Sequence, residues 1–299
     1  MKNLPISVII TTYNDSEYLS SAIDSIFSQK ILPMQLVIVD DGSDSDESYI
    51  ITNKYISNKR NVNVSYFKKE NGGASSARNL GIKHINQPYV TFLDADDEML
   101  PDNLNTKYSA IKKLDDRYFG VYGSGITTER KSHNFIDYDG IACTSYVGKY
   151  NVGVPGGCYY YLFRTSCLIK IGCFDEELPN NEDFDILIRL LMSGKACKGS
   201  VVCGNLITIR KNSLSRDSNS KKVFNNVMKF LDKAEYENYF DKGELEYRRK
   251  YAHLFLVRRI FFKNPSDAFT HIKLAFSYCK PVGWKEKMLY NLGSVSSFK

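Results

Sequence analysis

The sequence predicts an α/β protein in which helices flank a mostly parallel sheet and a helical segment follows at the C-terminus. Apolar, β-branched runs alternate with stretches of helical periodicity over the first hundred residues, which is the pattern of right-handed βαβ units. With 299 residues, 43% of them hydrophobic, the chain can build one large core and an appended segment. We therefore expect one domain over residues 1–220, with halves at 1–100 and 101–220, and a separate helical segment over 221–299.

The first strand and the first helix are the clearest elements. Ile6–Thr11 is apolar and β-branched, as is typical of a strand buried on both faces. Asn14 and Glu17 have the spacing of a capping box, which predicts that a helix begins there. An apolar stripe at helical spacing continues that helix: Tyr18, Leu19, Ala22, Ile23, Ile26 and Phe27.

The later segments repeat this alternation. We predict strands at Leu36–Val39, Val62–Phe67 and Tyr89–Leu93, and helices at Asp46–Ser57, Ser75–Ile85 and Glu182–Met192. From residue 120 to residue 161, glycine and aromatic residues interrupt both periodicities, and residues 156–161 have the pattern of a turn followed by a buried strand.

Composition excludes several classes of protein. The seven cysteines include no C-x-x-C pair and are odd in number, which argues against a zinc ribbon and against a disulfide framework. No secretory signal is visible at the N-terminus, and no uncharged apolar run reaches the roughly 18 residues of a membrane-spanning helix. The four histidines show no metal-ligand spacing. We expect a cytoplasmic protein with reduced thiols.

Four polar clusters follow directly on the carboxyl ends of predicted strands. A single cluster of this kind usually forms a turn or caps the next helix. In an open α/β sheet, however, this edge is where ligands bind, so four clusters in succession predict a binding site. The clusters are Thr11-Thr12-Tyr13, Asp40-Asp41, Glu70-Asn71-Gly72 and Asp94-Ala95-Asp96-Asp97.

The acidic residues of these clusters indicate a ligand that includes a cation. The chain has neither the G-x-x-x-x-G-K-[ST] loop of a P-loop protein nor a G-x-G-x-x-G after the first strand. Asp94, together with Asp96 or the adjacent Asp97, offers oxygen ligands for Mg²⁺ or Mn²⁺, and phosphate oxygens of a substrate can complete the coordination. Arg78, at the start of the following helix, can pair with the same phosphates.

With these motifs in place, the chain resembles the family 2 glycosyltransferases. The matching segments are ISVIITTYN, LVIVDDGSDSD, ENGGASSARNLGI, VTFLDADD, IGCFDEELPNNEDFDILIRL and, more weakly, RKNSLS, which together span residues 6–215. The resemblance implies a GT-A fold. It also implies transfer of a sugar from a nucleotide-diphosphate donor, most commonly a uridine diphosphate sugar, to a hydroxyl of a saccharide or lipid-linked saccharide.

The resemblance also assigns roles to individual residues. It implies that residues 1–100 bind the nucleotide and residues 101–220 the acceptor, and that Asp94-Ala95-Asp96 is the metal-binding D-x-D motif. Asp183, in the Glu182-Asp183 pair, is then the catalytic base. The remaining assignments are the base and ribose to Thr11, Tyr13 and Asp40 or Asp41, the diphosphate to Arg78, and the acceptor wall to Gly156 and Gly157. Family members often carry Arg-x-His in the motif that RKNSLS matches, whereas this chain has Arg210-Lys211-Asn212 there.

The predicted helix at 182–192 fits this role for Asp183. Phe184, Leu187, Ile188 and Leu191 turn one stripe of the helix into the core, so that Asp183 lies at its N-terminal end. First-turn acids often only complement the helix dipole. In a chain with the other clusters we favour Asp183 as the base that deprotonates the acceptor hydroxyl, opposite a metal-stabilised diphosphate, with inversion at the anomeric carbon.

The C-terminal segment is basic and aromatic. The formal net charge of +6 arises mostly beyond residue 220, and residues 248–299 intersperse Lys and Arg with aromatic side chains. Such a mixture suits an interfacial helix on an anionic membrane surface, but also a solvated helical pair packed on the first domain. Basic aromatic surfaces also bind nucleic acid, although the chain has no recognisable module of that kind.

Two rival functions remain on sequence grounds. A sugar-nucleotide nucleotidyltransferase would use a similar sheet, but it would carry a glycine-rich, basic phosphate loop where this chain has TTYNDSEY. A non-catalytic nucleotide-sugar binding subunit would be expected to lack Asp183 or the D-x-D motif, and both are present.

Overall fold

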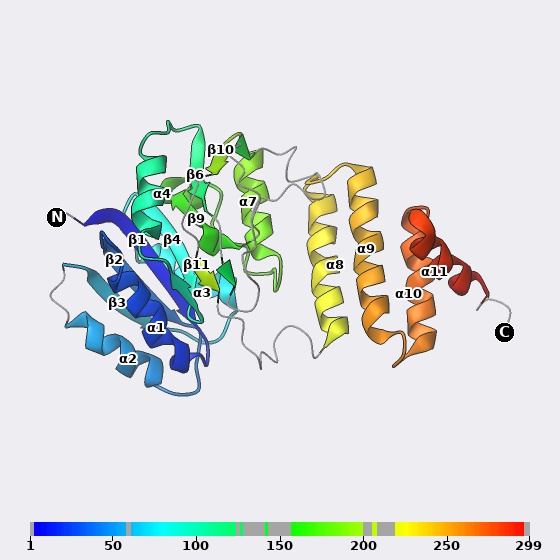
Figure 1. Cartoon of the computed structure of the whole chain (residues 1–299), viewed down its shortest axis with the longest axis horizontal. Helices are drawn as coiled ribbons and strands as arrows, with labels where there is room; N and C mark the ends of the chain where they lie inside the picture. The colour runs from blue at the N-terminus through cyan, green and yellow to red at the C-terminus, as the bar shows by residue number, and fades with distance from the viewer. Residues whose placement is uncertain are drawn as a thin grey trace. The chain divides into compact units, whose positions relative to one another are not determined.

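The chain forms two compact units in a computed structural model (Figure 1). The structure describes residues 3–57, 61–123, 126–127, 141–142, 157–199, 205–207 and 219–295. The first unit comprises residues 1–211 and the second residues 212–299.

The first unit is built around an eight-stranded sheet of order β3-β2-β1-β4-β9-β6-β10-β8. The pairs β1–β2, β1–β4, β2–β3 and β6–β10 are parallel, whereas β9 is antiparallel to both β4 and β6. A small second sheet has the order β5-β11-β7. The strands are β1 (Leu4–Thr12), β2 (Pro33–Asp40), β3 (Asn63–Lys68), β4 (Tyr89–Asp94), β5 (Asp97–Met99), β6 (Tyr118–Tyr122), β7 (Ile126–Thr127), β8 (Ile141–Ala142), β9 (Tyr161–Arg164), β10 (Ala196–Gly199) and β11 (Asn205–Ile207).

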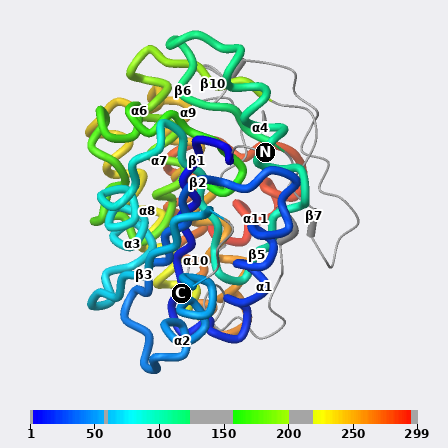
Figure 2. The backbone as a smooth tube through the Cα atoms, turned by 90° about the vertical axis from the view of Figure 1, so that its left-hand side faces the viewer, coloured from blue at the N-terminus to red at the C-terminus, as the bar shows by residue number. Residues whose placement is uncertain are grey.

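Helices cover both faces of the large sheet (Figure 2). Successive side chains of a strand point to opposite faces, and in β1 Val8 and Ile10 pack with α1 and α4 in the main apolar core. Ile9 instead meets α3, where a Cβ at Gly81 would lie 2.6 Å from its Cγ2 atom. The helices are α1 (Ser16–Phe27), α2 (Glu47–Ile56), α3 (Ala74–Lys83), α4 (Asn103–Ile111), α6 (Thr165–Lys170) and α7 (Glu182–Met192), with a 3₁₀ turn η1 (Cys158–Tyr160).

The predicted α/β class, with a mostly parallel sheet, flanking helices and a helical C-terminal segment, is confirmed. Two local expectations were wrong. Asn14 does not cap α1, because Asp15 is the N-cap residue and Asn14 lies in the left-handed region at φ 55°, with its side chain bonded to Asp44. The strand expected within residues 156–161 begins only at Tyr161, after the 3₁₀ turn.

The described part of the second unit, residues 219–295, contains four helices: α8 (Ser220–Tyr236), α9 (Lys242–Ile260), α10 (Pro265–Tyr278) and α11 (Gly283–Val295). Its apolar core joins Leu256 and Val257 of α9 to Ile272 of α10, with Phe224 and Leu289 packed against them. Within the described part of the chain, no helix combines the length and the apolarity that crossing a bilayer requires.

Candidate active site

The sheet register brings three of the sequence-predicted clusters together. Thr11 is paired with Asp94 across β1 and β4, and Thr12 is paired with Asp40 across β1 and β2. The Thr11 hydroxyl donates to Asp94 Oδ1 at 3.4 Å, and the Ala95 amide donates to the Thr11 carbonyl at 3.1 Å. The polar residues at these strand ends therefore share one edge of the sheet, as predicted.

Arg78 of α3 joins this edge to α7. Its guanidinium donates to Asp94 Oδ1 at 3.2 Å, to Glu182 Oε1 at 3.0 Å and to Asp183 Oδ1 at 3.2 Å. Only 4% of the Arg78 side chain is exposed, so these ion pairs are poorly screened by solvent. One buried cation thus holds the first aspartate of the D-x-D motif and both acids of the Glu182-Asp183 pair within a few ångströms of one another.

A second contact of α3 explains how the N-terminal end of α7 is held beside Arg78. The Asn79 side-chain amide donates to the Phe174 carbonyl, and its side-chain oxygen accepts from the Phe174 amide, both at 2.9 Å. The Phe174 ring also lies 5.5 Å from the Arg78 guanidinium. Asn79 therefore anchors the turn that precedes α7, a role that its sequence position did not predict.

The three acids in the first turn of α7 bind two different arginines. Asp185 is fully buried and accepts from Arg189 at 2.8 Å, and Arg189 also donates to the carbonyls of Ile171 and Cys173. This pair secures the N-terminal half of the helix. Glu182 and Asp183 instead face Arg78, so they do more than complement the helix dipole.

Burial raises the pKa of Asp183 to about 6. The Arg78 guanidinium opposes this rise, the carboxylates of Glu182 and Asp94 add to it, and a hydrogen bond from the Cys158 thiol opposes it. Cys158, in the 3₁₀ turn, is itself buried, and burial raises the pKa of its thiol well above the ordinary value. A carboxylate with a pKa near neutrality is suited to general base catalysis.

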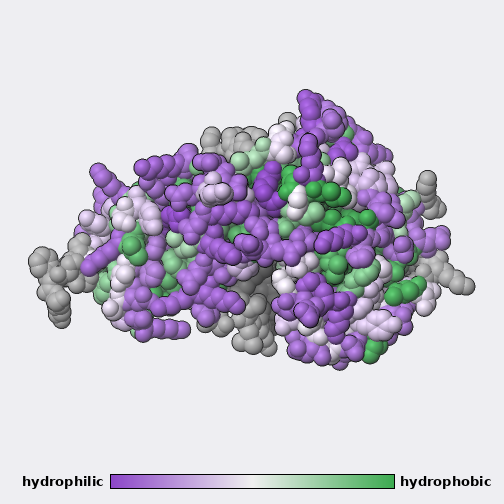
Figure 3. Space-filling model, turned by 180° about the vertical axis from the view of Figure 1, so that it is seen from behind, coloured by the Kyte–Doolittle hydropathy of each residue, from purple (hydrophilic) through white to green (hydrophobic). Residues whose placement is uncertain are grey.

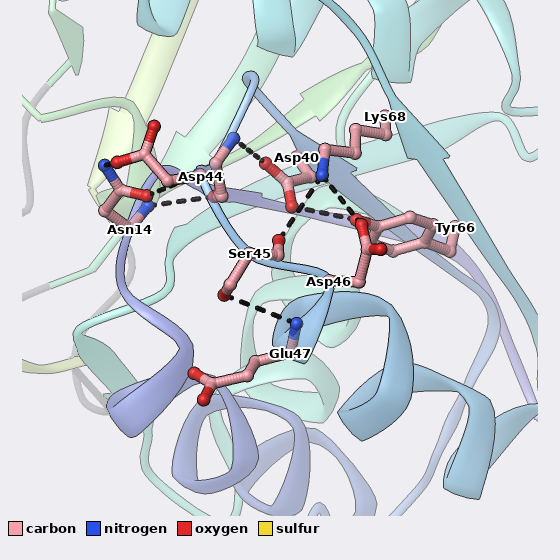
Figure 4. Close-up of polar contacts among 9 residues, drawn as sticks. Asn14, Asp40, Asp44, Ser45, Asp46, Glu47, Tyr66 and Lys68 are labelled. Atoms are coloured by element: carbon pink, nitrogen blue, oxygen red, sulfur yellow. Dashed lines mark hydrogen bonds and ion pairs between the residues drawn. The ribbon is translucent and has the colours of Figure 1, made fainter.

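Asp40 and Asp41 are buried and already accept hydrogen bonds from the protein. Asp40 accepts from the Ser43 amide at 2.7 Å and from the Tyr66 hydroxyl at 2.8 Å (Figure 4), and burial, followed by the Asp40 hydrogen bond, raises the pKa of Tyr66. Asp41 accepts from Lys69 and from the amides of residues 72 and 73. Both residues shape the loops at the sheet edge, and a role for either in holding the nucleotide stays a prediction.

The loops after β1 and β2 are also joined to each other. The Asn14 side chain donates to Asp44 Oδ2 at 3.0 Å and accepts from the Asp44 amide at 2.9 Å (Figure 4). Tyr13, the residue before it, remains 47% exposed, and its contact with the nucleotide stays a prediction. The sequence suggested neither this loop-to-loop contact nor the left-handed backbone of Asn14.

The residues of the D-x-D motif are suited to a divalent cation. Both hydrogen bonds given above for Asp94 use Oδ1, which leaves Oδ2 for a metal, and Asp96 is only partly buried. Among the residues that the structure describes, no group of three acidic, histidine or cysteine side chains could enclose an ion. Carboxylate oxygens are ligands that Mg²⁺ or Mn²⁺ takes together with substrate phosphates and water.

The predicted acceptor wall is only partly described. Gly156 lies outside the described residues, as do Arg210, Lys211 and Asn212. Gly157 precedes the 3₁₀ turn, and a Cβ added to it would lie 2.4 Å from Cζ of Tyr159. This glycine therefore lets the Tyr159 ring lie over the backbone.

Comparisons with known proteins identify the domain. The model of the family described as glycosyl transferase family 2 matches residues 7–154. An uncharacterized glycosyltransferase of Rickettsia felis is 31% identical over 62% of this chain, and the match covers 31% of that protein. The amylovoran biosynthesis glycosyltransferase AmsB of Erwinia amylovora is 29% identical over 63% of this chain and 64% of its own length. This chain therefore corresponds to about a third of its Rickettsia relative.

Solved structures show the same fold. TarS of S. aureus, residues 1–349 in complex with UDP-GlcNAc, superimposes with a TM-score of 0.61 and 18% identity over 97% of this chain and 79% of that one. The mannosyltransferase PcManGT from Pyrobaculum calidifontis, in complex with GDP-Man and Mn²⁺, gives a TM-score of 0.61 and 17% identity over 100% and 82%. The predicted GT-A fold is confirmed.

Proposed function

This chain belongs to the family 2 glycosyltransferases, and from that premise we propose that it transfers a sugar from a nucleotide-diphosphate donor to an acceptor hydroxyl. The observation that carries the proposal is the Arg78 cluster. It gathers Asp94, at the carboxyl end of β4, and Asp183, a carboxylate with a raised pKa, around one buried guanidinium.

In the proposed reaction, Asp183 accepts the proton of the acceptor hydroxyl as its oxygen attacks the anomeric carbon of the donor. The new bond forms between that carbon and the acceptor oxygen, while the bond from the carbon to the diphosphate oxygen breaks and its electron pair leaves with the nucleotide. Because attack and departure occur on opposite faces of the sugar, the product has inverted configuration. Glu182 shares Arg78 with Asp183 and would keep the base oriented between turnovers.

Arg78 acts in this scheme mainly by positioning. Its guanidinium already binds three carboxylates, so pairing with a diphosphate would require it to exchange at least one of these bonds. When a donor binds, its phosphates would compete for Arg78 and leave Asp183 with one fewer cationic partner. Loss of that partner would raise the proton affinity of Asp183 at the moment when a base is needed.

Asp94 and Asp96 would hold a Mg²⁺ or Mn²⁺ ion. When bound, such an ion would neutralise the diphosphate of the donor and so favour its departure. The support for a metal is the oxygen donor set of this motif, together with the complex of PcManGT with GDP-Man and Mn²⁺.

We propose a uridine diphosphate sugar as the donor and a saccharide or lipid-linked saccharide as the acceptor. TarS has been solved with UDP and with UDP-GlcNAc, which supports uridine, whereas the GDP-Man complex of PcManGT shows that the fold also takes guanosine. The name of AmsB refers to amylovoran biosynthesis, which supports a polysaccharide product. Thr11 and Tyr13 would contact the nucleoside in this arrangement.

The proposal is tested by screening nucleotide sugars for release of nucleoside diphosphate, with Mn²⁺, with Mg²⁺ and with a chelator. We expect at least one donor to turn over only when a divalent ion is present. Asp94→Ala should abolish this turnover, whereas Asp116→Ala, which removes an exposed carboxylate elsewhere in the unit, should leave it unchanged. Full turnover by a folded Asp94→Ala protein, or equal turnover in chelator, would refute the metal site.

A further inference from the structure

Helix α11 carries an apolar stripe that faces away from the core of the second unit. Trp284, Met288 and Leu292 are 70%, 55% and 40% exposed, and their spacing of four residues places them on one side of the helix. Another side of the helix packs inward. Leu289 contacts the apolar core, and Gly293 approaches α10 so closely that a Cβ would lie 2.6 Å from Ile272 Cγ2.

The charged side chains of residues 279–295 are also divided between an inward and an outward side. Glu286 is the only acid in residues 279–295, and it is turned inward, where it accepts from Lys250 at 2.9 Å, from the Tyr251 hydroxyl at 3.0 Å and from the Val282 amide at 2.8 Å. The Lys250 side chain is fully buried. The exposed ionic groups that remain on the segment are Lys280, Lys285 and Lys287, which are all positive.

We propose that this face of α11, formed by Trp284, Met288 and Leu292 with Lys285 and Lys287 beside them, docks on an anionic lipid surface. An apolar stripe flanked by lysines is the pattern of a helix that lies in the plane of a membrane interface. Tryptophan is favoured at the level of the headgroups, and lysines near the surface are attracted to anionic lipid.

Charge also argues against other occupants of this face. A second copy of the chain docked through the same face would bring like charges together across a two-fold interface, without an exposed acid on the segment to compensate. A nucleic acid would pair with the lysines, but it would leave Met288 and Leu292 without an apolar partner. The anionic bilayer satisfies both features.

The structure narrows the membrane-binding segment that the sequence suggested. Of the aromatic residues interspersed through residues 248–299, Phe261, Phe269 and Phe276 are partly buried against the apolar core of the unit. Phe255 and Phe262 are 40% and 95% exposed but lie outside α11. Hydrophilic residues make up most of the surface of this unit in the view of Figure 3. The proposal concerns one face of α11 and not the whole basic segment.

The single tryptophan of the chain makes the test direct, because Trp284 is then the only source of tryptophan emission. The full chain is mixed with phosphatidylcholine vesicles or with vesicles that also contain phosphatidylglycerol. We expect a blue shift of emission and co-flotation with the anionic vesicles alone, weakened by added salt. Each of Lys285→Gln and Lys287→Gln should weaken partitioning about fivefold.

Matched variants distinguish insertion of the α11 face into the bilayer from nonspecific adsorption to vesicles. Met288→Ser should reduce flotation. Tyr236→Ala, which removes an 84% exposed aromatic between Glu235 and Glu237, should leave flotation unchanged. Far-ultraviolet circular dichroism checks that both variants are folded. No flotation, or equal flotation with neutral vesicles, would overturn the proposal. A concentration-dependent blue shift without lipid would overturn it in favour of self-association. Nucleotide-sugar hydrolysis, measured without vesicles, reports on the transferase proposal separately.

Discussion

The Asn79 side chain and the Phe174 backbone exchange two hydrogen bonds of 2.9 Å, although 95 residues separate them. This contact fixes the turn before α7 against α3, the helix that carries Arg78. Because Arg78 and Asn79 are adjacent, the same helix both positions α7 and binds its first two acids. The geometry of the site therefore depends on a residue that does not touch Asp183.

Asn79→Ala tests this dependence. The substitution leaves the buried amide and carbonyl of Phe174 without their partners, which should lower the free energy of unfolding by about 1–3 kcal/mol. Sugar transfer should fall further than donor binding, because α7 and its acids lose their anchor. Denaturant unfolding and donor titration measure the two effects, with the exposed Asn53→Ala as the control. Unchanged unfolding and unchanged transfer would show that the contact is dispensable.

The pH dependence of transfer follows from the environment of Asp183. As a base it must be ionised, so kcat/KM should rise with pH through about 6, the value to which burial raises the pKa of Asp183. The Cys158 hydrogen bond lowers that pKa. Cys158→Ala should therefore move the rise to higher pH, and Cys158→Ser, which keeps a donor, should move it less. Identical pH profiles for all three proteins would show that Cys158 does not influence the pKa of the catalytic base.

Gly157 offers a test of the acceptor side. A methyl group at this position would lie 2.4 Å from Cζ of Tyr159, so Gly157→Ala must displace the ring. If the ring borders the acceptor, KM for the acceptor should rise while KM for the donor stays unchanged. Steady-state kinetics with each substrate varied in turn make this distinction. A selective rise in KM for the donor would show that Gly157 borders the donor site and not the acceptor site.

The second unit contains a histidine pair that sequence spacing did not suggest. Nδ1 of His253 lies 2.7 Å from Nδ1 of His271, and burial, followed by the charges of His271 and Arg249, lowers the pKa of His253 to about 4. Burial also lowers the pKa of His271. At least one ring must be neutral for the two to share a hydrogen bond.

This pair should make the second unit sensitive to acid. Because the folded state holds His253 below its ordinary pKa of about 6.5, the unfolded state binds more protons between pH 6.5 and 4, and stability must fall as pH falls through that window. The slope for one such group is at most about 1.4 kcal/mol per pH unit. Denaturation followed by Trp284 emission measures it. His253→Phe should flatten the dependence, and the exposed His84→Gln should not.

The fold was largely predictable because its signals are local. The apolar run at Ile6–Thr11 and the stripe at Glu182–Met192 each record burial in a short stretch of sequence, and the observed α7 has the predicted bounds. The shared edge of Thr11 and Asp94 also followed, because parallel strands direct their carboxyl ends to one side.

The contacts within the site were less predictable because they depend on tertiary approach. Nothing in the spacing of Cys158 and Phe174 indicates that they lie beside Asp183 and Arg78, and nothing indicates that Asn79 holds Phe174. The ion pairs of Arg78 with three carboxylates were not predicted, and its role at the diphosphate stays a prediction. The Asn14 prediction failed because the cap signal of α1 competed with a hydrogen bond across the loop to Asp44.

The most direct test of the proposed mechanism is the rate of transfer by Asp183→Asn, measured in single turnover with saturating donor. The amide preserves the size of the side chain and removes its ability to accept the proton, so the chemical step should slow by about 10²–10⁴-fold, while donor affinity stays near that of the native protein. Glu177→Gln, an acid-to-amide change at an exposed position, should leave the rate unchanged. A folded Asp183→Asn protein that transfers sugar at the native rate would contradict the assignment of Asp183 as the base.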